Sequence, residues 1–269
     1  DSEIVKVSNQ KIANDNGVFW SKIINNRRVG YGLEFGKHYL DNLSPSFLFI
    51  TGDGNPRFST QDVGQLYLWD LPFLIFGAFL LVRKKEGHWW LIPVWVLLGI
   101  IPAATARETP HALRIETIMP TLQIITAYGF VESAYRLKKY RQVIISSLLF
   151  LLFLGLVFFY HGYAKHYARE YSGEWQYPYK EAVAYVGQAK NNYKSVEITD
   201  GLGRPYIYFL LYDKYDPRDF RKSAKIDREV FGFVHVRSFD KYKFRKGAER
   251  GNLEKDTLYL DVPDNVPKE

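Results

Sequence analysis

Residues 143–160 read VIISSLLFLLFLGLVFFY and residues 89–106 read WWLIPVWVLLGIIPAATA, each without a charged side chain. An α-helix rises about 1.5 Å per residue, so either stretch covers roughly 27 Å, close to the ~30 Å apolar thickness of a bilayer. Both stretches therefore predict transmembrane helices, although the mean hydropathy of the whole chain, -0.22, is that of a soluble protein.

Two weaker candidates flank these stretches, at residues 66–82 and 115–135. The first contains Asp70 near its start, and the second contains Glu116 and Glu132 toward its ends. Such groups are tolerated where a membrane helix faces other protein rather than lipid. The sequence therefore predicts four transmembrane helices that pack together.

Loops rich in lysine and arginine mark the cytoplasmic side of a membrane. Residues 83–85 (RKK) and 136–141 (RLKKYR) are two such loops, so the termini and the loop 107–114 are expected outside. These loops contribute to the net charge of +7, which therefore does not indicate nucleic-acid binding. The chain has no cysteine, which excludes disulfides and thiolate metal sites.

The flanking segments are more polar than the predicted spans. Residues 18–43 have apolar side chains at roughly helical spacing, which is typical of an amphipathic helix on the outer membrane surface. Beyond the last span, periodicity predicts helices and strands in alternation. The helices are expected at residues 179–190 and 205–215, and the strands at residues 195–199, 230–236 and 257–262.

The expected fold class is membrane all-α with four transmembrane helices, plus a small extracytoplasmic α/β domain. The parts are expected to cover residues 1–64, 65–163 and 164–269. The external segment before the first span has no signal-peptide pattern in front of it, and earlier spans could have carried it across. We therefore expect the C-terminal portion of a longer multi-pass protein.

The first candidate site is SPSFLFITGDGNPRFS, residues 44–59. Its glycines and proline suit a tight turn. A metal loop is disfavoured because the stretch offers one carboxylate and one amide without the later glutamate of an EF-hand. Two interpretations stay open: a turn alone, or a turn that holds Asp53 and Arg57 in a cavity above the membrane.

The second candidate site is RETPHALR, residues 107–114. Arg107, His111 and Arg114 lie at the outer interface beside a predicted helix start, which favours a pocket for a lipid phosphate. The alternative is that these side chains only reach toward lipid headgroups. Asp70, with Gln65 before it, is a further candidate, because a carboxylate within a span is either functional or a helix-packing contact.

Two other motifs are weaker. Residues 200–204 (DGLGR) join a predicted strand to a helix but lack the third glycine of a dinucleotide-binding fingerprint, so a simple turn is favoured over nucleotide binding. Tyrosine and tryptophan are dense over residues 160–179, which is typical of a membrane interface and also suits stacking on sugar rings.

In their order, four blocks resemble the C-terminal half of prokaryotic glycosyltransferase family 39 proteins. These are GT-C membrane enzymes related to dolichyl-phosphate-mannose protein mannosyltransferases and to the aminoarabinose transferases of lipid A. The blocks are SPSFLFITGDGNPRFS, GQLYLWDLPFLIFGAFLLVRK, IPAATARETPHALRIETIMPTLQIITAYG and YSGEWQYPYKEAVAYV. The resemblance runs from about residue 31 to about residue 215.

The resemblance implies a multi-pass protein of the prokaryotic cytoplasmic membrane that works on the cell envelope. It would transfer a sugar from a polyprenyl-phosphate donor to a protein, lipid or glycan hydroxyl outside the cytoplasm. The family's general base lies on a first external loop that this chain lacks, so no catalytic residue is assigned and the chain alone is expected to be inactive. No cofactor and no metal-binding residue are assigned.

The family's ETPHALR and GDGNPR blocks correspond to residues 108–114 and 52–57. Asp53, Arg57, Asp70 and Glu108 are thus candidates for a donor and acceptor cavity. The rival interpretation is a non-catalytic, membrane-anchored module that binds glycan or protein.

Overall fold

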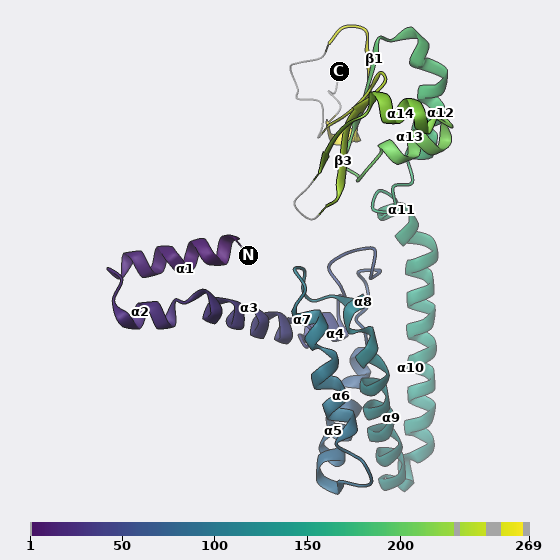
Figure 1. The fold of residues 1–269 in the computed structure, drawn as a ribbon. Helices are drawn as coiled ribbons and strands as arrows, with labels where there is room; N and C mark the ends of the chain where they lie inside the picture. The colour runs from purple at the N-terminus through teal and green to yellow at the C-terminus, as the bar shows by residue number, and fades with distance from the viewer. Residues whose placement is uncertain (1, 229–231, 246–253, 266–269) are drawn as a thin grey trace. The chain divides into compact units, whose positions relative to one another are not determined.

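The computed structural model describes residues 2–228, 232–245 and 254–265, and it divides into two compact units, residues 1–167 and 168–269. The first unit is helical and the second contains a sheet (Figure 1). The helices of the first unit are α1 Ser2–Asn14, α2 Phe19–Ile24, α3 Arg27–Asp41, α4 Pro45–Phe49, α5 Leu71–Lys84, α6 Leu91–Gly99, α7 Ile101–Ala104, α8 Ala112–Ile115, α9 Met119–Arg136 and α10 Arg141–His161.

Helix α10 lies within a longer helix, Lys138–Glu170, which continues through a π-helical segment at Gly162–Tyr167. In the described part of the chain, this is the one helix long and apolar enough to cross a membrane. Apolar side chains such as Leu149, Phe150 and Phe153 are exposed on it. A helix that is apolar on all sides needs an apolar environment, so this helix supports association with a membrane.

The expectation of four transmembrane helices is not supported. Helix α5 has 14 residues and covers about 21 Å, which is short of the bilayer core. The predicted span at 66–82 starts late because Asp70 accepts a hydrogen bond from the Tyr67 N–H at 3.0 Å and forms a 3₁₀ turn, Leu68–Asp70. The apolar helix Leu91–Ala104 is also short, and α9 is more polar than a spanning helix.

Helices α5 and α9 approach each other closely through two glycines. A Cβ atom on Gly77 would lie 2.1 Å from the Ile125 carbonyl oxygen, and one on Gly129 would lie 2.0 Å from the Phe73 carbonyl oxygen. Close backbone contact through small residues is the usual way that helices pack in membranes. At one end of the pair, Lys84 Nζ lies 2.8 Å from Glu132 Oε1.

The amphipathic stretch at residues 18–43 forms two helices, α2 and α3, instead of one. The break falls at Asn26, whose side chain accepts from the Arg28 N–H at 2.9 Å and caps α3. In Figure 1, α3 runs across the direction of α5, α9 and α10. The Tyr39 hydroxyl donates to the Leu97 carbonyl at 2.9 Å and fastens the end of α3 to α6.

The second unit is a mixed sheet with helices packed beside it (Figure 1). Strand order is β2-β3-β4-β1-β5; β1 runs parallel to β4 and β5, while β2, β3 and β4 are antiparallel neighbours. Val196, Ile198, Phe209 and Phe239 are among its buried core residues. The elements are α11 Ala168–Glu170, α12 Tyr179–Ala189, β1 Ser195–Thr199, α13 Tyr206–Tyr212, α14 Pro217–Ser223, β2 Lys225–Arg228, β3 Val234–Phe239, β4 Tyr242–Arg245 and β5 Thr257–Leu260.

Most elements expected in this unit are confirmed: α12, β1, α13 and β5 fall where periodicity predicted them. The strand expected at 230–236 begins at Val234, and residues 230–231 lie outside the described residues. The sequence prediction missed β2, whose four side chains are all exposed, and β4, which lies in a basic, turn-rich segment. Neither strand contains an apolar stretch long enough to be recognised as a strand from the sequence.

Candidate functional site

Asp53 joins the two loops that carried the resemblance. Its side chain is only 5% exposed. One carboxylate oxygen, Oδ1, accepts from the Asn55 N–H at 2.8 Å, and the other, Oδ2, accepts from the Ala112 N–H at 2.8 Å. Ala112 begins α8, so its N–H has no acceptor within that helix. The Asp53 carboxylate is the acceptor for this N–H, and residues 52–57 and 108–114 therefore form a single site.

The turn around Asp53 depends on glycine. Gly52 has a φ of +71°, and a Cβ there would lie 2.6 Å from Ser59 Oγ. The side chain of Asn55 stabilises the following part of the turn by accepting a hydrogen bond from the Arg57 N–H at 3.0 Å. Gln61 Nε2 donates to the Asp53 carbonyl at 2.6 Å and closes the loop. The prediction of a tight turn at this stretch is confirmed.

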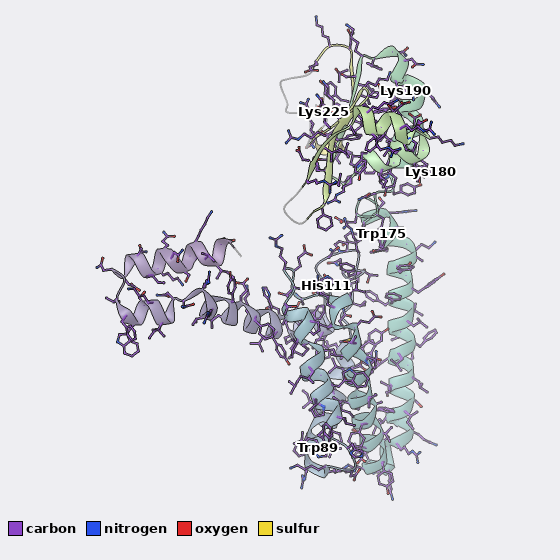
Figure 2. All side chains as sticks on the ribbon, in the orientation of Figure 1. Trp89, His111, Trp175, Lys180, Lys190 and Lys225 are labelled. Atoms are coloured by element: carbon purple, nitrogen blue, oxygen red, sulfur yellow. The ribbon has the colours of Figure 1, made fainter. Side chains whose placement is uncertain are left out.

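His111 lies beside Asp53, at the end of the helices opposite Trp89 (Figure 2). Its backbone N–H donates at 3.0 Å to Oδ1 of Asn42, a residue that is completely buried. Its ring centroid lies 4.8 Å from that of Phe58. Its Nδ1 atom is 3.8 Å from Asp53 Oδ2, and it is buried without a hydrogen-bond partner.

The three cations predicted to bind phosphate do not all lie together. Arg114 stays within a turn of His111, since its N–H donates to the His111 carbonyl at 3.2 Å, and its side chain is exposed. Arg107 instead lines a groove of about 750 Å³ between α1 and α3, together with Lys11 and Lys37. Neither His111 nor Arg114 borders that groove.

The remaining predicted residues occupy different environments. Arg57 and Glu108 are exposed. Asp70 and Gln65 line a cavity of about 520 Å³ between α5, α9 and α10. The walls of this cavity are largely apolar, and they include Phe73, Phe130, Leu148, Leu152 and Phe159.

The segment 63–67 connects this cavity to the Asp53 turn. Leu66 donates its N–H to the Leu48 carbonyl at 2.8 Å, and a Cβ on Gly64 would lie 2.5 Å from the same oxygen. Val63 lies against Gly52, since a Cβ on that glycine would be 2.8 Å from the Val63 carbonyl. The polar site and the apolar cavity thus share one loop.

Tyr167, one of the aromatic residues of the 160–179 segment, also reaches the site. Its hydroxyl donates to the Pro56 carbonyl at 2.6 Å, and its ring stacks on that of Tyr163 at 5.7 Å. The long helix Lys138–Glu170 is therefore tied to the turn through its end.

Residues 200–204 form a turn between β1 and α13, where Gly203 has a φ of +132°. Asp200 Oδ2 lies 3.5 Å from His235 Nε2. Within the described ranges, no group of three histidine, aspartate or glutamate side chains is arranged to hold a metal ion.

Sequence reasoning missed Asn42, Phe58 and Gln61, which hold His111 and Asp53 in place. A polar residue just after an amphipathic helix is ordinarily taken for a helix cap, so Asn42 gave no distinct signal. Comparison of the chain with protein-family models, curated proteins and solved structures finds no match.

Proposed function

We propose that this chain is part of a membrane glycosyltransferase that transfers a sugar from a polyprenyl-phosphate donor to an acceptor hydroxyl outside the cytoplasm. The observation that carries the proposal is the buried contact of Asp53 with Ala112 and His111. It unites the two segments that resemble the GDGNPR and ETPHALR blocks of such enzymes. A shared site is what a reaction between donor and acceptor needs.

The cavity beside this site suits the donor's chemistry. A polyprenyl phosphate has a long apolar chain and an anionic head, so its site needs apolar walls that open near cations. The cavity lined by Asp70 and Gln65 has largely apolar walls, and the segment 63–67 links it to the turn. The exposed guanidinium of Arg114 is the cation we assign to the phosphate, where it would offset charge on the leaving group.

The distribution of basic residues supports the assignment of sides. Residues 83–85 lie at the end of α5 and residues 136–141 lie at the junction of α9 and α10, at the end of the helices opposite His111 (Figures 1 and 2). Because positive loops stay in the cytoplasm, we place the site on the outer side. The helix Lys138–Glu170 would anchor the unit in the membrane.

The test is donor binding by the full chain in lipid nanodiscs, because binding of a donor can be measured independently of its turnover. We expect polyprenyl phosphate to bind, and Arg114→Ala to weaken binding about tenfold, the loss of ~1.4 kcal/mol expected for one charge-assisted contact. Arg221→Ala, which changes another exposed arginine, on α14, is the matched control and should leave affinity unchanged. No saturable binding would refute the proposal, and equal affinity in both variants would remove Arg114 from it.

A further inference from the structure

The surroundings of the His111 ring restrict where its proton lies. Nδ1 is buried without a hydrogen-bond partner, so none of the described N–H groups donates to it. The nearest charged atom is Asp53 Oδ2, at 3.8 Å. That carboxylate cannot turn away, because each of its oxygens accepts from a backbone N–H, of Asn55 and of Ala112.

The position of this carboxylate favours one tautomer of the neutral ring. A lone pair on Nδ1 would face the lone pairs of Asp53 Oδ2 with no donor between them, which is unfavourable in a buried site. A proton on Nδ1 instead faces a negative charge, and it can form a hydrogen bond when the contact tightens. The hydrogen bond on one ring nitrogen determines the state of the other, so Nε2 then carries the lone pair.

We infer that Asp53 is a positioning residue that keeps the proton of His111 on Nδ1, so that Nε2 accepts a hydrogen bond from a hydroxyl group of the substrate. The His111 side chain is 12% exposed while Nδ1 is buried, which leaves Nε2 as the ring nitrogen that a ligand can meet. The naming of a sugar or acceptor hydroxyl rests on the proposed function; the tautomer does not.

In this tautomer, His111 does not bind the phosphate. The phosphate of a polyprenyl-phosphate sugar is a diester, and its oxygens only accept hydrogen bonds at neutral pH. An acceptor nitrogen has nothing to offer such a group, whereas a hydroxyl is a donor. His111 therefore selects the hydroxyl-bearing part of the substrate, and the cation Arg114 is left for the phosphate.

The first experiment determines the tautomer without any ligand. Histidine labelled with nitrogen-15 is incorporated into the full chain in nanodiscs, and the ring nitrogens are recorded at about pH 8, with His111→Gln used to assign the signals. We expect the Nδ1–H form in the wild type. Asp53→Ala should lower the population of the Nδ1–H form, because no carboxylate then faces that nitrogen. Asp41→Ala is the control, since the Asp41 carboxylate accepts from the Thr109 hydroxyl in the same loop.

A wild-type ring with its proton on Nε2, or with protons on both nitrogens, would overturn the inference, because Nε2 would then be a donor. An Asp53→Ala variant with an unchanged tautomer population would also overturn the inference. Neither outcome depends on donor binding, so a failure here is distinct from a failure of the proposed function.

The second experiment identifies the source of the hydroxyl. Polyprenyl phosphate, polyprenyl-phosphate mannose and a panel of free hexoses are titrated separately at about pH 8, where a phosphate monoester has lost both protons. A change in the Nε2 chemical shift with the lipid-linked sugar alone would show that the hydroxyl belongs to the donor sugar. The affinity of His111→Gln should then be about fivefold weaker for that lipid alone. A shift with a free hexose would assign the acceptor. Equal shifts with polyprenyl phosphate, or none with any sugar, would overturn the inference.

Discussion

The contact between α5 and α9 can be tested by adding one methyl group, in Gly129→Ala. The added Cβ would lie 2.0 Å from the Phe73 carbonyl oxygen and 2.7 Å from the Gly77 nitrogen, both backbone atoms. Ordinary contacts begin at 3.4 Å, so the two helices must separate by about 1.4 Å at this point. Overpacking of this kind typically costs about 1–3 kcal/mol, because neither backbone can rotate out of the way.

The assay is reversible unfolding of the full chain in detergent, followed by circular dichroism. Gly36→Ala is the matched control: Gly36 also lies inside a helix, α3, but a Cβ there meets nothing within 4 Å. We expect this control to gain about 0.5–1 kcal/mol from the higher helix propensity of alanine. If Gly129→Ala also gained stability, the close approach of α5 and α9 would be refuted.

Two further predictions concern stability. Burial raises the pKa of the Tyr179 hydroxyl to about 12, so folding favours the neutral phenol. The free energy of unfolding should therefore fall by about 2–3 kcal/mol as pH rises from about 10 to about 12. Unfolding curves of Tyr179→Phe measured across this pH range should show a smaller fall. Asn42→Ala should cost about 1–3 kcal/mol in denaturant unfolding, because the His111 N–H and the His38 carbonyl each lose a buried partner. A cost no larger than that of Asn191→Ala, which changes an exposed asparagine, would show that Asn42 does not hold the loop.

The sequence was informative where a feature depends on neighbouring residues. The charge-free run at 143–160 lies inside the one helix among the described residues that is long and apolar enough to span a membrane, and the alternation in β1 was sufficient to place that strand. The hydropathy pattern predicted more spans than the structure supports, because hydropathy contains no information on backbone geometry. The turn formed by Asp70 with Tyr67 shortens α5, and nothing in the average apolarity of residues 66–82 predicts it.

The site was predictable only in its parts. Asp53 and His111 were both candidates, but their contact depends on packing between segments far apart in the chain. Arg107 was grouped with His111 because the two are close in sequence, yet Arg107 lines the groove between α1 and α3, which His111 does not border. Buried polar partners such as Asn42 and Gln61 resemble ordinary cap and loop residues until the fold brings them together.

The hydrogen bond from Ala112 to Asp53 joins residues 59 positions apart, and α5, α6 and α7 lie between them in the chain. During synthesis, the carboxylate of Asp53 must therefore remain hydrated until those three helices have emerged and returned the chain to the same end. The entropy cost of closing so long a loop must be met before this contact can form. Burial of Asp53 therefore depends on the whole intervening segment having folded back to the same end of the unit.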